Sequence, residues 1–352
     1  MRGWPSSYGS RLQSDYSGVQ VPLRALKVTY IITQEEIKKV LTIDDAIKAV
    51  EKAFSEYALG NAQMPPKSYL SFPKGDLRSM PTYLAYSNIA GIKSVNVHPF
   101  NKKLPTVMAI ILLIDPSNGY PLAVLDGTYI TNMRTGAAGA VAAKYLSRKD
   151  AKTAGFIGTG EQAKTQLAGL LEVRLLKEIK AYDINKKKLA AFCEEASKKY
   201  NIQSRATGIE EAANSDIVVT TTPVRKPIVK ADWIKEGCHI NAIGADAAGK
   251  QELESSILKK AKIVVDNWEQ ASHSGEINVA FSTGGIINKG IITKKDIYAE
   301  LGEIVAGKKP GRQNDKEITI FDSTGLAIQD ISTAFFVYNK LDKTKLLKVD
   351  FF

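Results

Sequence analysis

A strand, a glycine-rich turn and a helix follow one another directly, and this succession constrains the fold more than any other feature of the sequence. The apolar run 153–157 has strand character, the segment Gly158-Thr-Gly160-Glu-Gln-Ala163 comes next, and a helical pattern continues to about Arg174. Strand-like runs then recur, most of them separated by helical segments, at 178–183, 216–222, 239–245, 262–266 and 318–321. Such alternation predicts an α/β fold whose parallel sheet is covered by helices on both faces.

The glycine pattern, in this setting, is typical of a dinucleotide-binding site. Gly158 and Gly160 allow the backbone to approach a pyrophosphate, and the free N–H groups at the start of the following helix favour an anion. Thr221, in the Thr-Thr-Thr-Pro run that ends a later strand, is placed to line the adenosine side, although threonine is also common in strands without any such role. A glycine turn without a cofactor is the alternative interpretation of the segment.

The choice of dinucleotide depends on Asp183. This residue ends the next strand, 25 residues after Gly158. Its carboxylate can accept hydrogen bonds from ribose hydroxyls, and its charge repels a 2′-phosphate. The sequence therefore predicts NAD as the cofactor, although the three lysines at 186–188 keep NADP open.

The chain before this region has a different texture. Capping boxes at Thr33–Glu36 and Thr42–Asp45 begin two helices, and Gly60 ends the second. Beta-rich runs follow at 68–72, 92–97, 106–114 and 121–125, with a hairpin turn over 115–119, so that a mostly antiparallel sheet is expected. A last helix, over 326–341, is expected to return to this sheet.

We therefore expect three parts. Residues 1–27 lack a sustained apolar stretch and are interpreted as a disordered extension. Residues 28–145 together with 326–352 form an α+β domain. Residues 146–325 form a Rossmann domain that binds the dinucleotide.

Composition excludes several classes of protein. The net charge is +11, but the basic residues are spread along the chain and no run of five occurs, so a nucleic-acid partner is not expected. The longest apolar run, Val107–Ile114, is far shorter than the roughly 20 residues of a membrane span. Two cysteines, Cys193 and Cys238, are too few for a disulfide framework and indicate a reducing, cytoplasmic compartment. Three histidines without paired spacing make a metal site improbable.

Four cations are candidates for the chemistry of a nicotinamide enzyme that acts on an amino or imino acid. Lys67, Arg78, Lys93 and Arg134 are each flanked by small or apolar residues, which indicates partial burial. The fork of an arginine suits a carboxylate. A lysine suits proton transfer, since burial among cations lowers its pKa.

Asp246 is the candidate carboxylate. It follows the predicted strand 239–245, at the edge where open α/β sheets bind their ligands. A carboxylate there can act as a base toward water or an amine. The alternative is a cap for a helix near 249–253.

Seven motifs occur in order: Met64-Pro-Pro-Lys67, Gly75-Asp-Leu-Arg-Ser-Met-Pro81, Arg134-Thr-Gly-Ala-Ala-Gly139, Gly155-Phe-Ile-Gly-Thr-Gly160, Ile243-Gly-Ala-Asp246, His273-Ser-Gly-Glu-Ile-Asn278 and Asp322-Ser-Thr-Gly325. With these motifs, the chain from about residue 28 onward resembles the ornithine cyclodeaminase/mu-crystallin family. Within that family it is most similar to the archaeal-type alanine dehydrogenases, through residues 64–67, 240–250 and 317–330.

The resemblance implies an NAD-bound homodimer that is paired through the sheet of the first domain. It implies that Lys93 is the acid/base residue near the substrate nitrogen and that Asp246 is its carboxylate partner. Arg78 and Arg134 would hold a substrate carboxylate or a cofactor phosphate, with Lys67 as a further substrate-binding residue. The residues implied to line the dinucleotide, besides the glycines, are Glu161, Gln162, Asp183, Ile184, Asn185, Gly244, Ala245, Asp246, Lys250 and Ser323.

One departure bears on the substrate. Cyclodeaminases carry a glutamate at the position of Arg78, where it can meet the distal amine of ornithine. Two like charges roughly 4 Å apart cost about 4 kcal/mol at an effective dielectric constant of about 20, so a cation here favours a short monoamino acid.

The leading expectation is therefore oxidative deamination of L-alanine to pyruvate and ammonia, together with the reverse reaction. Hydride would pass from Cα to NAD and water would add to the imine, while Lys93 and Asp246 move the protons. The alternatives are ornithine cyclodeaminase, a cyclic-ketimine reductase, and a binding protein like mu-crystallin.

Overall fold

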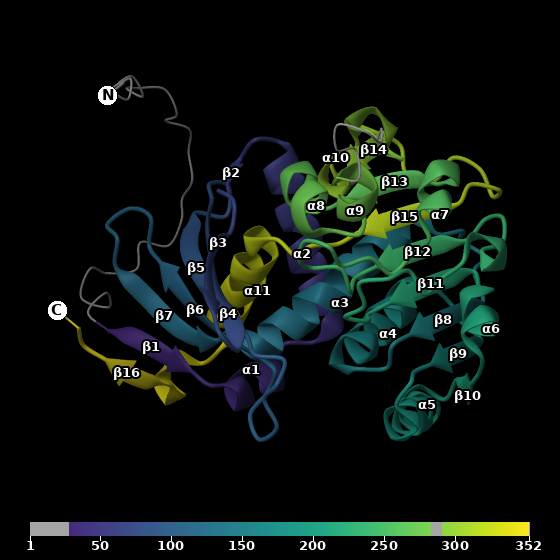
Figure 1. Cartoon of the computed structure of the whole chain (residues 1–352). Helices are drawn as coiled ribbons and strands as arrows, with labels where there is room; N and C mark the ends of the chain where they lie inside the picture. Colours follow the sequence, from purple (N-terminus) through teal and green to yellow (C-terminus); the bar gives the residue numbers. More distant parts are fainter. Residues whose placement is uncertain (1–27, 283–290, 352) are drawn as a thin grey trace.

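Two mixed layers of helix and strand make up the part of the chain that the computed structural model describes, residues 28–282 and 291–351. Each layer is built on one eight-stranded sheet, and the two sheets lie side by side (Figure 1). The α/β class is confirmed. The expected extension over residues 1–27 lies outside the described residues.

The first sheet is mostly antiparallel, as predicted. Its strand order is β16-β1-β7-β6-β5-β4-β2, with β3 paired to β4, and only the β1–β7 pair is parallel. The strands are β1 (Thr29–Ile32), β2 (Ala62–Gln63), β3 (Ser68–Phe72), β4 (Gly75–Leu84), β5 (Ile89–Val97), β6 (Val107–Ile114), β7 (Pro121–Asp126) and β16 (Leu347–Val349). The hairpin turn is confirmed by the hydrogen bond from Gly119 N to Asp115 O, at 2.8 Å.

Four helices accompany this sheet: α1 (Gln34–Val40), α2 (Ile43–Ala58), α3 (Gly127–Leu146) and α11 (Ala327–Lys340). Both predicted capping boxes are present, at Thr33 before α1 and at Thr42 before α2. The last helix, α11, packs against β4, β5, β6 and α2, and so returns to the first sheet as expected.

Several elements were not predicted from the sequence, and the two longest of them, β4 and α3, have clear physical reasons. The strand β4 contains Pro81 and the charged pair Asp76 and Arg78, which mask its alternation of buried and half-buried residues. The helix α3 is buried along nearly its whole length, because it lies between the two sheets and contacts α2, α4, α11 and β12. A helix covered on all sides has no polar face for the sequence to reveal.

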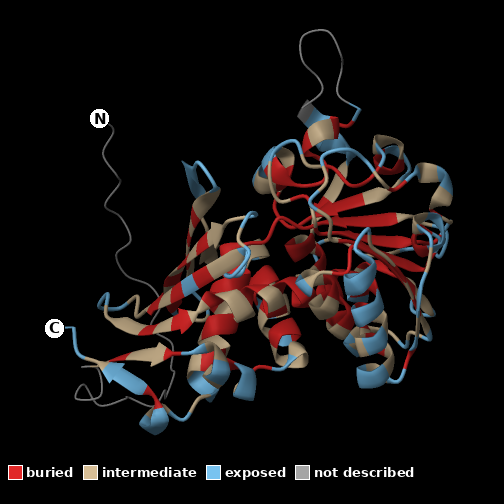
Figure 2. Cartoon of the chain, turned by 60° about the horizontal axis from the view of Figure 1, so that its bottom comes forward, coloured by how far each residue is buried: buried red, intermediate tan, exposed pale blue. Residues whose placement is uncertain are grey.

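The second sheet is wholly parallel, in the order β10-β9-β8-β11-β12-β15-β13-β14. Its first strand in sequence, β8, lies between β9 and β11, so the strand order reverses there as in a Rossmann fold. Its inner strands β11, β12 and β15 are fully buried, whereas the edge strand β10 is mostly exposed (Figure 2). The strands are β8 (Thr153–Ile157), β9 (Glu178–Tyr182), β10 (Gln203–Ala206), β11 (Ile217–Thr220), β12 (His239–Ala242), β13 (Lys262–Val265), β14 (Ile297–Glu300) and β15 (Thr319–Asp322).

The helices around this sheet vary widely in length. They are α4 (Glu161–Val173), α5 (Lys186–Tyr200), α6 (Ile209–Ala213), α7 (Ser255–Lys260), α8 (Trp268–Ser274), α9 (Asn278–Ser282) and α10 (Leu301–Val305). Short 3-10 turns occur at Ala231–Trp233, Lys294–Asp296 and Lys343–Lys345. Among the described residues, no helix combines the length and the apolar character needed to cross a membrane.

Helix α6 packs so closely on β8 that no side chain fits at Gly155, and a substitution there tests this packing. A Cβ at this position would overlap the carbonyl oxygen of Ala212, which belongs to α6 and cannot move without disturbing that helix. We expect Gly155→Ala to lower the free energy of unfolding by about 3 kcal/mol, measured by urea denaturation. The control is Gly208→Ala, where no described atom lies within 4 Å of the added Cβ and the expected loss is about 1 kcal/mol or less. Equal losses in the two variants would contradict this account of the packing.

Candidate functional site

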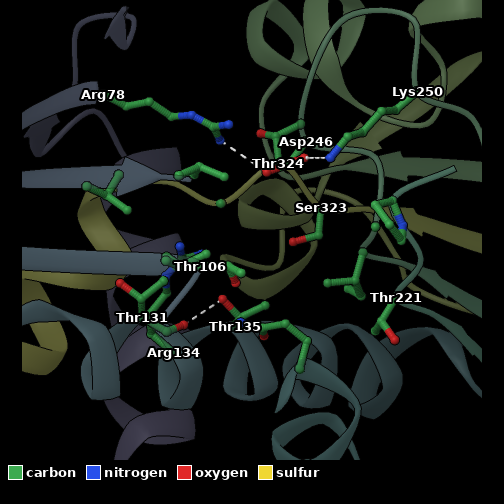
Figure 3. A pocket seen from close by; sticks show the side chains of 18 of the residues that line it. Arg78, Thr106, Thr131, Arg134, Thr135, Thr221, Asp246, Lys250, Ser323 and Thr324 are labelled. Atoms are coloured by element: carbon green, nitrogen blue, oxygen red, sulfur yellow. Dashed lines mark hydrogen bonds and ion pairs between the residues drawn. The ribbon is translucent and has the colours of Figure 1, made fainter. Parts of the chain in front are cut away.

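A cavity of about 350 Å³ lies between the two sheets, at the carboxyl ends of the strands of the second sheet. Side chains from β4, β5 and α3 reach it from one side, and loops that follow β11, β12 and β15 reach it from the other (Figure 3). The predicted site residues that line it are Lys67, Arg78, Lys93, Arg134, Gln162, Thr221, Gly244, Asp246, Lys250 and Ser323. Candidates from both halves of the chain therefore meet at one place.

Lys93, on β5, is the most deeply buried cation of the cavity, with 1% of its surface exposed. Its Nζ lies 2.6 Å from Oδ2 of Asp330, a fully buried residue of α11. Burial and the neighbouring guanidinium of Arg134 lower the pKa of Lys93 to about 7, although Asp330 opposes them. The lysine can therefore exchange a proton near neutral pH.

The expected pairing of Lys93 with Asp246 is wrong, because Asp330 takes that place. Asp330 also accepts a hydrogen bond of 2.9 Å from Nε of Arg134, so one carboxylate bridges the two cations. The side chain of Gln329 holds Nη1 of the same arginine, at 2.9 Å. Asp330 was not predicted, since its partners lie more than 190 residues earlier and a single acidic residue inside an amphipathic helix gives no local signal.

Asp246 belongs to a second charge cluster, on the other side of the cavity. Its Oδ2 lies 3.1 Å from Nη1 of Arg78 and its Oδ1 lies 2.5 Å from Nζ of Lys250 (Figure 3). Burial raises the pKa of Asp246, but Lys250 and Arg78 outweigh burial and hold it below its usual value. The alternative role as a helix cap is excluded, because the fully described segment 247–253 forms no helix.

Arg78 points into the cavity, and its charge is compensated there. Besides Asp246, it contacts both carboxylate oxygens of Asp76, at 2.9 and 3.2 Å. The repulsion of about 4 kcal/mol expected for a second ammonium assumed an uncompensated arginine at an effective dielectric constant of about 20. Two carboxylates within hydrogen-bonding distance reduce that repulsion.

Lys67, in the loop between β2 and β3, is the last of the four predicted cations that line the cavity. Its Nζ donates a hydrogen bond of 2.7 Å to the carbonyl oxygen of Thr324, in the loop after β15. Burial lowers the pKa of Lys67 to about 8, although the nearby Asp266 opposes this. The loop after β15 is fixed in turn by Asp266, whose carboxylate accepts hydrogen bonds from the backbone N–H groups of Thr324 and Gly325.

The glycine-rich loop fits a dinucleotide. Gly158 has a φ of +93°, a conformation that side chains disfavour, and a Cβ at Gly160 would meet no described atom within 4 Å. Gly160 caps α4 without any side-chain hydrogen bond, which leaves the first N–H groups of this helix available to an anion. Next to them, Oε1 of Gln162 is buried without a hydrogen-bond partner among the described residues and lines the cavity.

Asp183 lies directly after β9, beside this loop. Its Oδ2 accepts hydrogen bonds from the backbone N–H of Thr159, at 2.8 Å, and from its hydroxyl, at 2.9 Å, while Oδ1 accepts one from the backbone N–H of Asn185. Burial raises the pKa of Asp183, but these hydrogen bonds outweigh it and hold the pKa below the usual value. The charged carboxylate keeps room for a further donor, since an ionised carboxyl group has about four acceptor positions.

The remaining predicted residues lie outside the cavity wall. Ile184 is 88% exposed, and Glu161 is exposed and paired with Lys164. The side chain of Asn185 is used to cap α5, because it accepts hydrogen bonds from two backbone N–H groups of that helix. Ala245 is fully buried.

The cavity also contains three threonines that the sequence did not single out, Thr106, Thr131 and Thr135. In the part of the chain that the structure describes, no group of three or more His, Cys, Asp or Glu residues could hold a metal ion.

Comparison with known proteins places this geometry in a family. Residues 27–345, which include every residue of the cavity wall, match the model of the ornithine cyclodeaminase/mu-crystallin family. The chain belongs to this family. The matched residues include both the sheet that carries Lys93 and the sheet that carries the glycine-rich loop.

Relatives within the ornithine cyclodeaminase/mu-crystallin family align over almost the whole chain. The alanine dehydrogenase of Archaeoglobus fulgidus is 55% identical over 330 residues, which cover 92% of this chain and 99% of that protein. The structure of an archaeal alanine dehydrogenase dimer with bound NAD has a TM-score of 0.88 at 54% identity and covers 92% of this chain and 100% of that one. The Delta(1)-pyrroline-2-carboxylate reductase of Thermococcus litoralis, in complex with NADH and L-proline, has a TM-score of 0.86 at 42% identity, covering 90% of this chain and 99% of that one.

Proposed function

We propose that the chain is an NAD-dependent amino-acid dehydrogenase that converts L-alanine to pyruvate and ammonia and catalyses the reverse reaction. The observation that carries the proposal is Lys93, a buried lysine with a pKa near 7 that lines a cavity adjoining a dinucleotide-binding loop. The similarity to archaeal alanine dehydrogenase over 92% of the chain supports the choice of alanine.

The proton transfers are divided between two charge clusters. Lys93, Arg134 and Asp330 form the first, and Asp246, Arg78 and Lys250 form the second. When bound, NAD accepts the hydride that leaves Cα of the amino acid. Neutral Lys93 takes a proton from the substrate nitrogen, so that the lone pair can form the imine as the hydride leaves. Asp246, which is ionised because its pKa is lowered, takes a proton from the water that adds to the imine carbon. Arg134 and Lys67 hold the substrate carboxylate, since both line the cavity close to Lys93.

Three further proposals concern the roles of the domains, the oligomeric state and the location of the protein. Residues 28–145 with 326–352 form the substrate-binding and dimerisation domain, and residues 146–325 form the NAD-binding domain. Homodimer formation through the first sheet is supported by exposed apolar side chains on that sheet, including Leu70 and Ile110, which are 59% and 58% exposed. A reducing, cytoplasmic location is supported by Cys193 and Cys238, which are both free thiols.

The test of the proposed function is the formation of NADH by the purified protein with L-alanine. Pyruvate and ammonia should appear in amounts equal to NADH. L-Ornithine is the first comparison: if it yields L-proline and ammonia without net NADH, the protein is a cyclodeaminase and the proposal fails. The compensated charge of Arg78 makes this comparison necessary.

A cyclic-ketimine reductase is the second candidate. It is favoured by the 42% identity to the reductase that was solved with NADH and L-proline. The same assay with L-proline and NAD, and with the cyclic imine and NADH, separates the candidates. Turnover of the cyclic imine at more than the rate of pyruvate with ammonia would reverse our choice of substrate.

Asp183 should decide the preference for NAD. We expect Asp183→Ser to raise the ratio of kcat/KM for NADP to that for NAD by about 100-fold, because the substitution removes a like charge from the position of the 2′-phosphate. The control is Asp232→Ser, which removes an exposed carboxylate that does not line the cavity. An unchanged ratio in Asp183→Ser would mean that another group selects the dinucleotide.

A further inference from the structure

Three buried carboxylates lie behind the cavity without lining it. Glu252, Glu276 and Asp322 each have 0% of their surface exposed. Glu276 lies in the His-Ser-Gly-Glu-Ile-Asn motif and Asp322 begins the Asp-Ser-Thr-Gly motif, so both belong to sequence features that the proposed chemistry does not use. Burying a carboxylate is costly unless hydrogen bonds compensate it, and their hydrogen bonds show what these groups do.

Glu252 joins the ends of two neighbouring strands. One of its oxygens accepts hydrogen bonds from the backbone N–H and the hydroxyl of Thr222, each at 2.6 Å, just beyond β11. The other accepts from the backbone N–H of Gly244, at 2.9 Å, just beyond β12, and from the hydroxyl of Thr220, at 2.7 Å. Thr222 and Gly244 both line the cavity, and Asp246 follows two residues after Gly244.

The other two carboxylates hold the segment that carries Glu252. Glu276 accepts hydrogen bonds from the backbone N–H groups of Glu252, at 3.0 Å, and Leu253, at 2.7 Å. Asp322, at the end of β15, accepts from the backbone N–H groups of Glu276 and Ile277, at 2.9 and 3.1 Å. The three carboxylates thus form a series in which each fixes the backbone that bears the next.

We propose that Glu252 is a positioning residue, which sets the place of Asp246 and of the β11 loop relative to substrate and dinucleotide. This inference rests on the proposed function. Glu252 acts through Thr222 and Gly244 and does not itself touch the cavity. Four donors converge on its two oxygens, and only an ionised carboxylate offers acceptors alone. A glutamine at this position would point its NH₂ group at the N–H and O–H donors on one side, in place of the carboxylate oxygen that accepts their hydrogen bonds.

The test compares Glu252→Gln with a matched variant, Glu56→Gln. Glu56 is 4% exposed and accepts hydrogen bonds from the backbone N–H and the hydroxyl of Ser87, but it lies in α2, away from the cavity. Both variants remove one buried, hydrogen-bonded carboxylate. Activity is expressed per NADH-binding site, titrated by NADH fluorescence, so that loss of folded protein does not count as loss of function.

We expect Glu252→Gln to lower kcat per NADH-binding site by about tenfold and to raise KM for L-alanine, so that kcat/KM falls by up to about 100-fold. Glu56→Gln should leave both constants within about twofold, whatever it does to the melting temperature. A purely structural Glu252 would lower only the number of binding sites. If kcat per site and KM in Glu252→Gln match the wild type, the proposal is overturned.

Thr220→Val provides a milder variant in case Glu252→Gln does not fold. Thr220 is fully buried, does not line the cavity, and gives one of the four hydrogen bonds to Glu252. The expected loss is about fivefold in kcat/KM, the effect of one hydrogen bond, and wild-type constants would count against the proposal. If the wild type lacks alanine-dependent activity, the proposed function fails. The role of Glu252 is then decided by the NADH dissociation constant, which must still weaken in Glu252→Gln but not in Glu56→Gln.

Discussion

Lys93→Ala is expected to lower kcat for L-alanine by about 10³-fold, because the substitution removes the group that we propose as the proton acceptor for the substrate nitrogen. The measurement is NADH formation at saturating NAD and alanine. Added primary amines of small size should restore part of the activity, since the truncated side chain leaves room for them in the cavity. Rescue that follows the basicity of the amine would identify proton transfer as the lost function.

The control for this variant is Lys144→Ala, which removes a lysine whose side chain is 46% exposed and paired with Glu51 on the surface. It should retain wild-type kcat. If Lys93→Ala kept more than about a tenth of the activity, general acid–base catalysis by Lys93 would be excluded, since this kind of catalysis contributes about 10²–10⁴-fold.

Asp330→Asn is expected to have the second large effect, on pH dependence and on stability. In the wild type, the deamination rate kcat/KM should rise with pH through a pKa near 7, because Lys93 must be neutral to accept a proton and its pKa is about 7. Asp330 raises the pKa of Lys93 against burial and Arg134. Without that carboxylate charge the pKa falls further, so the rise in rate should move to lower pH.

The same variant leaves the buried guanidinium of Arg134, and Lys93 whenever it is protonated, without their shared counter-charge. We expect the free energy of unfolding of Asp330→Asn to fall by about 3–5 kcal/mol at neutral pH, measured by urea denaturation. Asp44→Asn is the control, because Asp44 is half exposed and paired with Lys48 on the surface, where an ion pair contributes about 0–1 kcal/mol. A pH profile that stayed in place, or moved to higher pH, would show that the titrating group is not Lys93.

Local signals in the sequence were sufficient for most of the fold. The capping boxes at Thr33 and Thr42, the hairpin at 115–119 and the succession of strand, glycine turn and helix from residue 153 each depend on residues close together in the chain. The helix α3 and the strand β4 depend on their surroundings instead. Burial on all sides removes the periodicity of α3. The charged residues of β4 are tolerated because Arg78 is paired with Asp76 and with Asp246.

In the candidate site, too, local signals reveal some residues, while their contacts depend on the whole fold. Residues such as Arg78, Lys93 and Asp246 could be predicted, since their sequence neighbours indicate burial or the end of a strand, and the structure places all three at one cavity. Which charge meets which could not be predicted. The partner of Lys93 comes from α11, and the partner of Asp246 comes from β4 on the opposite sheet, so both pairings exist only in the folded chain.

The position of Asp330 has a consequence for the nascent chain. A ribosome adds this residue 196 positions after Arg134 and only after the strands β8–β15 have all been made. Until then the two cations on β5 and α3 have no carboxylate between them, and burying them unpaired would be strongly unfavourable. We therefore expect the first sheet to close around Lys93 and Arg134 late in translation, once α11, the last α-helix of the described chain, supplies the carboxylate.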